Sequence, residues 1–328
     1  MGPSPALKPA AATTPVQLTC PTCAKVLDGE PNFCPACGAD LRGLSGSSDT
    51  LDGAARQTID GRYRVLEKLG EGGMGAVFKV EHVRMGKIAA LKLLRPDHAV
   101  DKGLKARFLQ EARVVARLSH PNTVQVFDSG ELDDGSLFIA MEYVPGKDLA
   151  WHLKAQGPLR QEKVVSIGLQ VLGSLQEAHE AGVVHRDLKP ANVMISKRGE
   201  TKLMDFGIAQ NEDLERLTQL GQVVGTPSYM SPEQISGAQV DARSDLFSLG
   251  VVLYEAVSGT KPFTGATVGE VFSRVVSGRH RPLRKAAPGS PRALNKVIDS
   301  LMAGEPEHRF PDATQARRAF EALVDTLD

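Results

Sequence analysis

The chain has 328 residues, with 39 basic and 39 acidic side chains and an isoelectric point near 7.1. This balanced charge gives no indication of nucleic acid or an anionic membrane surface as a partner. No apolar run reaches the roughly 20 residues that a membrane-spanning helix needs, and the N-terminus lacks the apolar segment of a secretory signal. We therefore expect a cytoplasmic protein, long enough to form two lobes or domains.

The cysteines are all close to the N-terminus, in two Cys-x-x-Cys pairs. They are Cys20 with Cys23 and Cys34 with Cys37, and ten residues separate the pairs. Four thiolates presented by two such turns can surround Zn²⁺ tetrahedrally, and a closed shell of four sulfurs indicates a structural site. A redox role for the pairs is the alternative. The pattern resembles a short zinc ribbon over residues 18–42 and predicts structural Zn²⁺.

The segments on either side of the predicted zinc ribbon differ from the ribbon in composition. Residues 1–17 are rich in Pro, Ala and Thr and are predicted to be a disordered tail, while residues 43–57 read as a flexible linker of Gly, Ser and Asp. Acidic residues inside the ribbon argue against binding to phosphate. The ribbon is therefore predicted to bind a regulatory protein, although a metal-stabilised cap without any partner remains an alternative.

Beyond the linker, short apolar or alternating runs bounded by Gly, Asp or Pro predict a small, mostly antiparallel sheet. One helix, at residues 101–118, interrupts these strands, and Glu111 lies on its apolar face. Lys92 shares a strand face with the apolar residues Ala90 and Leu94, which favours a buried charge that has a partner. A Lys92–Glu111 pair would neutralise both charges. The strands are expected at residues 63–70, 76–83, 87–94, 123–131 and 137–144.

After Pro145 the periodicity becomes helical. A long aperiodic stretch, residues 208–234, lies within this part, and long loops of this kind are usually functional. The sequence thus predicts a β-rich lobe at 58–144 and an α-rich lobe at 145–328 within one domain, 58–328. The helices are expected at residues 163–179, 244–257, 267–277, 291–303 and 312–326.

Three motifs carry candidate chemistry. The glycines of GEGGMG (residues 70–75) follow one strand and precede another, whereas a dinucleotide-binding turn would need a helix there. HRDLKPAN (185–192) places ionisable side chains between apolar segments, and Asp205-Phe206-Gly207 follows a strand-like run. By themselves, the glycines could form a hairpin without a ligand, and Asp205 could be a simple turn former.

The motifs in this order, with Lys92 in its strand, Glu111 in its helix and Ser231-Pro232-Glu233 further on, resemble the protein kinase family. The resemblance covers residues 59–326. It implies an α+β bilobal protein kinase fold, with a β-rich N-lobe and an α-helical C-lobe, preceded here by the small zinc ribbon. It also implies transfer of the γ-phosphate of ATP, with Mg²⁺ (or Mn²⁺), to protein substrates. GEGGMGAVF, HRDLKPANVMI and GTPSYMSPEQ are most similar to the bacterial, eukaryotic-like branch.

The resemblance also implies roles for individual residues. Lys189 and the Gly225-Thr226 pair match the family's Ser/Thr members rather than its tyrosine kinases. Asp187 would accept or orient the proton of the substrate hydroxyl, and Lys189 would neutralise charge on the γ-phosphate. Asn192 and Asp205 would bind Mg²⁺, and Lys92, held by Glu111, would bind the α- and β-phosphates. The backbone of Gly70, Gly72 and Gly75 would contact the phosphates. Adenine would lie between Val77, Ala90 and Met194, beside a hinge that includes Met141, Glu142 and Val144.

Regulation is expected in the long loop. Thr218 lies where this branch often carries an autophosphorylation site, and Arg186 could pair with a phosphate there. Thr226 is expected to order the loop through Asp187 and Lys189. Autophosphorylation would use a transient homodimer. The resemblance further predicts a buried Glu233–Arg309 ion pair, a bond from Asp245 to the backbone of HRDLKPAN, and a buried His185.

The alternative function is a catalytically silent, kinase-like scaffold that acts through the zinc ribbon. Retention of Lys92, Asp187, Asn192 and Asp205 together favours the active enzyme. A kinase for small molecules would lack the Gly-Thr and Ser-Pro-Glu segment, which is present. We therefore predict a protein serine/threonine kinase with neither nucleic acid nor a membrane as a partner.

Overall fold

The computed structural model describes residues 17–20, 25–28, 58–72, 75–94, 109–110, 112–132, 135–206 and 227–327. The chain divides into two units, Met1–Arg56 and Gln57–Asp328. Most of the predicted tail and all of the predicted linker lie outside the described residues. None of the helices in the described part is both long and apolar enough to cross a membrane.

In the first unit, strands β1 (Gln17–Thr19) and β2 (Val26–Asp28) form an antiparallel pair, with Leu18 opposite Leu27. Cys20 follows β1 directly and is buried. Its backbone N–H donates to the carbonyl of Lys25 over 2.9 Å, so the two ends of the segment that contains Cys23 lie close together. Cys23, Cys34 and Cys37 lie outside the described residues, so the predicted zinc shell is untested.

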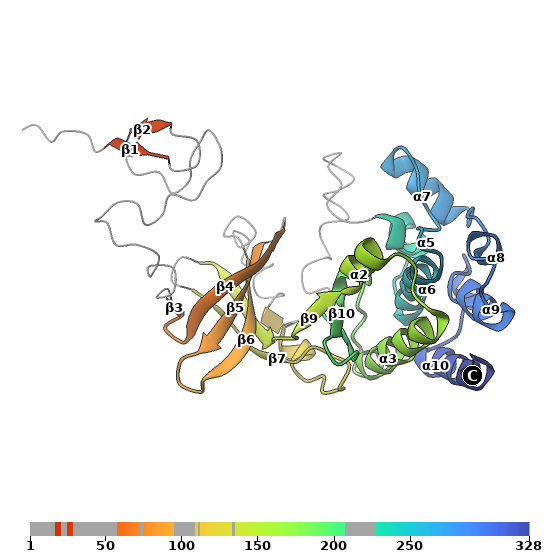
Figure 1. Cartoon of the computed structure of the whole chain (residues 1–328), viewed down its shortest axis with the longest axis horizontal. Coiled ribbons are helices and arrows are strands. Elements are labelled where there is room, and N and C mark those ends of the chain that lie inside the picture. Colours follow the sequence, from red (N-terminus) through yellow and green to blue (C-terminus); the bar gives the residue numbers. More distant parts are fainter. Residues whose placement is uncertain are drawn as a thin grey trace, which may run out of the picture. The chain divides into compact units, whose positions relative to one another are not determined.

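The second unit begins with a six-stranded antiparallel sheet in the order β3-β4-β5-β6-β8-β7. Figure 1 shows these strands, in orange to yellow-green, gathered in one part of the unit. The five predicted strands are all present, and the two-residue β3 is additional. Their bounds are β3 (Thr58–Ile59), β4 (Tyr63–Gly72), β5 (Gly75–His82), β6 (Lys87–Leu94), β7 (Val126–Glu131) and β8 (Leu137–Glu142).

Both faces of the sheet carry buried side chains. Successive residues of a strand point to opposite faces, so a run of apolar residues supplies both. Along β6, Ala89 and Leu91 join one apolar cluster with Phe138, while Ala90 and Leu94 join another with Met141. The strand expected at 123–131 begins three residues late. Thr123 instead forms a parallel bridge to Leu203, outside this sheet.

The remainder is mostly helical, and the five predicted helices of this part are confirmed. The helix α2 was missed because only Leu149 among its eight residues is buried, so no apolar period is visible. A three-stranded sheet, β11-β10-β9, is also present. The bounds are β9 (Gly146–Asp148), α2 (Leu149–Gln156), α3 (Gln161–Glu180), β10 (Val193–Ser196), β11 (Thr201–Leu203), α5 (Pro232–Ser236), α6 (Ala242–Ser258), α7 (Val268–Val276), α8 (Leu283–Ala286), α9 (Arg292–Leu301) and α10 (Ala313–Leu327), with short 3₁₀ turns at Pro190–Asn192, η4 (Pro227–Tyr229) and Pro306–His308.

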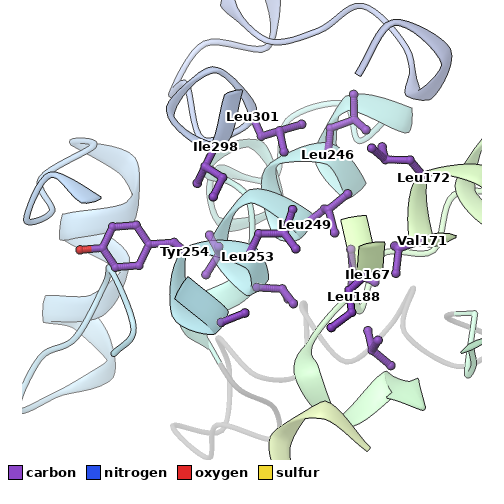
Figure 2. Close-up of a cluster of buried hydrophobic side chains, with 14 of the residues drawn as sticks. Ile167, Val171, Leu172, Leu188, Leu246, Leu249, Leu253, Tyr254, Ile298 and Leu301 are labelled. Atoms are coloured by element: carbon purple, nitrogen blue, oxygen red, sulfur yellow. The ribbon is translucent and has the colours of Figure 1, made fainter. Parts of the chain in front are cut away.

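The core of the helical part is built around α6. This helix is buried on nearly all sides, as its continuous apolar sequence predicts, and it packs on α3 and α9. Figure 2 shows Leu246, Leu249 and Leu253 of α6 between side chains of α3 and α9. A helix that is packed on nearly all sides moves little, so it can rigidly support other segments that contact its ends.

Of the helix expected at 101–118, the structure describes helical residues at 109–110 and 112–115. Ala112, Val115 and Leu118 are buried, which agrees with the predicted apolar face. Glu111 itself lies outside the described residues. Its expected pairing with Lys92 is therefore untested.

Candidate active site

The helix α6 holds the segment around His185 through hydrogen bonds. Asp245 is fully buried and accepts hydrogen bonds from the backbone N–H groups of His185 (2.7 Å) and Arg186 (2.8 Å). Its Oδ2 also lies 2.8 Å from Nε2 of His179 in α3. This confirms the expected bond from Asp245. The partner His179 was missed, since nothing in the sequence relates the two positions.

The ring of His185 is buried, as predicted. It lies 4.7 Å from the ring of Phe206, centroid to centroid, and its Nε2 is 2.9 Å from the carbonyl oxygen of Met204. These contacts join the HRDLKPAN segment to the Asp205-Phe206-Gly207 motif. Two motifs that are separate in the sequence thus form one packed unit.

Arg186 has a backbone φ of +64°, in the left-handed region that side chains other than glycine rarely adopt. Such a conformation costs about 1–3 kcal/mol and persists only where the surroundings hold it. Here Gln234 of α5 donates from Nε2 to the Arg186 carbonyl over 2.8 Å, while Asp245 holds the Arg186 N–H. Both peptide groups of Arg186 are therefore fixed by neighbouring helices. Gln234 is a second positioning residue that the sequence did not reveal.

The charged side chains of the segment contact one another. Lys189 Nζ lies 2.6 Å from Asp187 Oδ2, and Asn192 Nδ2 donates to the Asp187 carbonyl oxygen over 2.7 Å and to its Oδ2 over 3.2 Å. Asp187 and Lys189 are each about one-quarter exposed. A carboxylate, an ammonium and an amide thus meet at one half-buried point that solvent still reaches.

Asp205 lies beside this group because of the β10–β11 hairpin. Val193 pairs with Leu203, so Asn192 and Met204 lie at the same end of the hairpin, and the Met204 N–H donates to the Asn192 carbonyl over 3.0 Å. Asp205 has a backbone φ of +56°. Its Oδ1 lies 3.0 Å from Nζ of Lys92, which reaches it from strand β6. Lys92 and Asp205 are 113 positions apart in the chain.

Asn192 and Asp205 have a donor set that fits Mg²⁺. Carboxylate and amide oxygens are the ligands that hard divalent cations prefer. Asn192 donates through Nδ2, and Lys92 contacts Oδ1 of Asp205. Within the described part of the chain, Oδ1 of Asn192 and Oδ2 of Asp205 take part in no hydrogen bond, so both oxygens are available to a cation. Mg²⁺ binding here remains a prediction.

An apolar wall lies on the same sheet face as Lys92. Val77, Ala90, Met141, Val144, Met194 and Met204 all belong to one packed cluster. Val77 and Met194 are half-buried, so they line its partly open side. This cluster brings together all three residues that were expected to contact adenine. It combines them with Met141 and Val144 of the expected hinge.

Glu142, which was expected to belong to the hinge, contacts a strand of the C-lobe. Its Oε2 lies 2.9 Å from Nζ of Lys202 in β11, and its backbone N–H donates to the Gln125 carbonyl over 2.8 Å. Lys202 is a further positioning residue that the sequence did not reveal. Its place on β11 could have been found only by pairing β10 with β11.

The glycines of residues 70–75 form a hairpin, as predicted. Gly72 at the end of β4 pairs with Gly75 at the start of β5 in an antiparallel ladder. No helix follows, which removes the dinucleotide-binding alternative. Gly73 and Met74, which separate the two strands in the sequence, lie outside the described residues.

Comparison with known proteins agrees with this geometry. The model of the protein kinase domain matches residues 63–319. The chain belongs to the protein kinase family. It is 42% identical over 286 residues to the serine/threonine-protein kinase pkn3 of Myxococcus xanthus, covering 83% of this chain and 51% of that protein. It is 40% identical to the probable serine/threonine-protein kinase PknB of Bifidobacterium longum, covering 78% and 38%.

Among solved structures, the chain is similar to the PknI kinase domain of Mycobacterium tuberculosis. The TM-score is 0.66 with 32% identity, and the match covers 82% of this chain and 98% of that domain. The fold is thus the protein kinase fold, with a β-sheet N-lobe and a helical C-lobe. The chain spans about half or less of the length of these curated relatives. The kinase domain and the relatives at 37–42% identity support a protein serine/threonine kinase.

The buried ion pair expected in the kinase C-lobe is present. Arg309 Nη1 and Nη2 lie 2.7 and 2.8 Å from the two carboxylate oxygens of Glu233, and Ser244 Oγ donates to Glu233 Oε1 over 2.5 Å. Burial by itself raises the pKa of Glu233, but the hydrogen bonds from Arg309 and Ser244 hold that pKa below its ordinary value. The pair fixes α5, and thereby Gln234, against the start of α6.

Some predicted site residues remain outside this description. Glu111, Thr218 and Thr226 belong to the parts of the chain that the structure does not describe, as does Gly207. The pairing of Lys92 with Asp205 does not exclude Glu111 as a further partner, because a lysine ammonium has three donor hydrogens.

The hairpin formed by the glycines of residues 70–75 gives a prediction that separates an effect on folding from an effect on nucleotide binding. A Cβ on Gly75, whose φ is +157°, would lie 2.0 Å from the Leu93 carbonyl oxygen, whereas a Cβ on Gly70 meets nothing within 4 Å. Gly75→Ala is expected to lower the melting temperature by about 4 °C or more, since the backbone must shift. Gly70→Ala is expected to leave it unchanged but to weaken ATP binding, because its methyl group would keep phosphates from the backbone. Thermal unfolding and ATP titration of both variants check this; equal melting temperatures would contradict it.

Proposed function

We propose that this kinase transfers the γ-phosphate of ATP to serine or threonine hydroxyls of proteins. The observation that carries the proposal is the meeting of Asp187, Lys189 and Asn192 within hydrogen-bonding distance, at the end of the hairpin that presents Asp205 to Lys92. Phosphoryl transfer depends mainly on positioning and on positive charge near the transferred group. These side chains supply both.

In the proposed mechanism Asp187 accepts a hydrogen bond from the substrate hydroxyl and takes its proton. The hydroxyl oxygen bonds to the γ-phosphorus as the bond from that phosphorus to the β,γ-bridging oxygen breaks, and ADP leaves. Lys189, which contacts Asp187 here, would also reach a γ-phosphate brought beside that carboxylate. Lys92 would bind the α- and β-phosphates, and the apolar cluster around Ala90 would hold adenine. Mg²⁺ held by Asn192 and Asp205 would neutralise phosphate charge. The fixed peptide groups of Arg186 keep Asp187 in place during the reaction.

Regulation by autophosphorylation of Thr218 is part of the proposal. A phosphate there would add nearly two negative charges, for which Arg186 is the expected partner, while Thr226 would contact Asp187 and Lys189. A transient homodimer would allow one copy to phosphorylate another. The support is the sequence of the long loop, together with the fixed backbone of Arg186.

The test of the function is incubation of the purified chain with labelled ATP and Mg²⁺, followed by mapping of the labelled residues. We expect label on Thr218 and a rise in the activity of the wild type during preincubation with ATP. Thr218→Val should lose that rise while it retains basal transfer to other proteins, because Thr218 has no assigned role in the transfer step itself. An absence of label on the chain and on any generic protein substrate, despite ATP binding, would favour the silent scaffold.

We also propose that the N-terminal unit is a zinc ribbon that binds a regulatory protein. The support is the antiparallel β1–β2 pair, with buried Cys20 directly after β1 and its N–H bonded to the Lys25 carbonyl just before β2. A Cys-x-x-Cys pair between two paired strands can present both thiolates to one metal.

The zinc proposal predicts one Zn²⁺ for each chain. Cys20→Ser should lower the zinc content and expose the ribbon to proteolysis, since small metal domains unfold without their metal. Metal analysis by mass spectrometry and limited proteolysis measure both effects. Kinase activity of the same variant is the control for the second unit, and a full zinc content in Cys20→Ser would refute the site.

A further inference from the structure

Positive charge is concentrated in the segment from Val271 to Ile298. The segment holds seven arginine and lysine residues and no aspartate or glutamate, which leaves 32 basic against 39 acidic residues in the rest of the chain. All seven side chains are exposed. We call them the basic surface: Arg274, Arg279, Arg281, Arg284, Lys285, Arg292 and Lys296.

The residues of the basic surface follow one another along α7, α8 and α9. The Arg279 N–H donates to the Arg274 carbonyl over 2.9 Å at the end of α7, and Arg281 Nη2 donates to the Lys285 carbonyl of α8 over 2.6 Å. The helix α8 packs against α9. There, Arg292 and Lys296 lie one turn apart and both are exposed, since α9 buries Leu294, Ile298 and Leu301.

The charges of this surface are not neutralised by neighbours. Within the part of the chain that the structure describes, no ion pair joins any of the seven to a carboxylate. The charge of Asp299 acts on His280 and Arg284 from a greater distance, and Glu270 accepts a hydrogen bond from the Ala266 N–H. Uncompensated positive charge raises the local potential and attracts anions.

The position of the surface relates it to protein substrates. The helix α7 buries Val271 and Val275 and packs against α5 and the turn η4, which begins directly after residues 207–226 in the chain. Figure 1 shows α7 beside α5. In the proposed function, the substrate hydroxyl lies at Asp187, and α5 connects that site to α7 because its Gln234 holds the carbonyl of the preceding residue, Arg186. A substrate segment outside the phosphorylated residues can therefore extend over α7.

The chemistry of the surface favours a peptide with carboxylates. Five of the seven residues are arginines, whose planar guanidinium groups pair with carboxylates through two hydrogen bonds. Single-stranded nucleic acid is usually bound with exposed aromatic rings. Among the described side chains the exposed large aromatics are Phe127 and Trp151, which lie outside this segment. A membrane would need an apolar face, but Val276 is the sole exposed large hydrophobic residue among those described between 271 and 298.

We propose that the basic surface docks an acidic segment of the protein substrate, at a distance from the residue that is phosphorylated. The inference rests on the proposed function and adds a substrate class to it, namely proteins with a run of Asp or Glu beside the phosphorylated region. Docking of this kind lowers KM without a change in kcat, because it contributes equally before and during phosphoryl transfer.

The first measurement uses the full chain and a fluorescein-labelled peptide of about twelve glutamates, with a glutamine peptide for comparison. The test variant carries Arg274→Gln, Arg279→Gln, Arg281→Gln and Arg284→Gln. The matched control carries Arg84→Gln, Arg117→Gln, Arg198→Gln and Arg318→Gln, which are equally exposed and cause the same change in net charge. We expect the glutamate peptide to bind, with affinity that falls with salt, and to bind the test variant about tenfold more weakly than the control.

The second measurement links docking to catalysis. The acceptor is a peptide of residues 216–226 with a tail of about eight glutamates or, for comparison, eight glutamines. We expect a KM about tenfold lower for the glutamate tail in the wild type and the control, and equal KM values for both tails in the test variant. Failure to phosphorylate either peptide, with binding of the glutamate peptide intact, would count against the proposed function and not against the surface.

Three outcomes would overturn the docking proposal. The first is equal loss of glutamate-peptide binding in the test variant and in the control, which would show an effect of net charge alone. The second is tighter, surface-dependent binding of single-stranded DNA or of phosphatidylglycerol vesicles than of the glutamate peptide. The third is a KM that does not depend on the tail in the active wild type.

Discussion

Asp187→Asn is expected to lower kcat for phosphoryl transfer by about 10³-fold, while the dissociation constant of ADP changes by less than about threefold. The amide cannot accept the substrate proton, which removes the group proposed to act as the base. It can still accept the hydrogen bond from Lys189, whose Nζ lies 2.6 Å from the present carboxylate, so the surrounding contacts are retained. Transfer of labelled phosphate and calorimetric titration with ADP measure the two quantities.

The matched control is Asp60→Asn. Asp60 has a backbone φ of +52°, a conformation that asparagine tolerates well, and it lies in the turn between β3 and β4, far along the sheet from Lys92. The control should retain full activity. An Asp187→Asn variant with unchanged kcat would remove Asp187 from the mechanism, and a parallel loss of ADP binding would indicate misfolding.

Arg309→Met is expected to have the largest effect on stability, a loss of about 3–5 kcal/mol in the free energy of unfolding. Arg309 is 5% exposed and binds both carboxylate oxygens of Glu233. It also donates to the carbonyls of Ala303, Gly304 and Arg243. Methionine fills a similar volume but leaves Glu233 buried without its cation. Urea unfolding measures the loss.

Arg317→Met is the control for this substitution. Arg317 pairs with Glu321 over 3.3 Å on α10, but the two side chains are 44% and 52% exposed. Solvent screens such a pair, so the loss should be below about 1 kcal/mol. Equal losses in the two variants would contradict the large contribution to the free energy of unfolding that we assign to the buried pair. The double variant Glu233→Gln with Arg309→Met should recover part of the loss, since no unpaired charge is then buried.

The same pair predicts a dependence on pH. The pKa of Glu233 in the folded state is lower than in the unfolded chain, so ionised Glu233 stabilises the fold. This contribution is complete above the ordinary glutamate pKa of about 4.3 and is lost as the pH falls through the lower, folded value. The difference in stability between the wild type and Arg309→Met should therefore shrink below about pH 4.

Local features of the sequence predicted much of the fold and the site. The two-residue period of β6 put Lys92 on the face of Ala90 and Leu94, and the structure agrees. The glycines between two strands predicted a hairpin, and the continuous apolar run of α6 predicted a buried helix. The motifs in their order identified the family and, through it, the Glu233–Arg309 pair.

Features that lacked a local signal were missed or left open. The helix α2 buries one residue, so its sequence shows no period. His179, Lys202 and Gln234 are ordinary polar residues of helices and strands, and they gain a role only from the partner that packing brings to them. The exposure of the basic surface likewise follows from how α7, α8 and α9 bury their apolar sides.

By itself, the sequence predicted which residues carry the chemistry, through the resemblance of its motifs to the family. It also predicted most of the strands and helices that hold them, because strand and helix periods depend on neighbours in the chain. Only the tertiary structure decided which charges meet. Lys92 reaches Asp205 across 113 positions, Asp245 holds the backbone of His185 across 60, and Gln234 holds that of Arg186 across 48. Such contacts depend on the packing of whole strands and helices around α6, and that packing is the sum of many apolar contacts that no short motif contains.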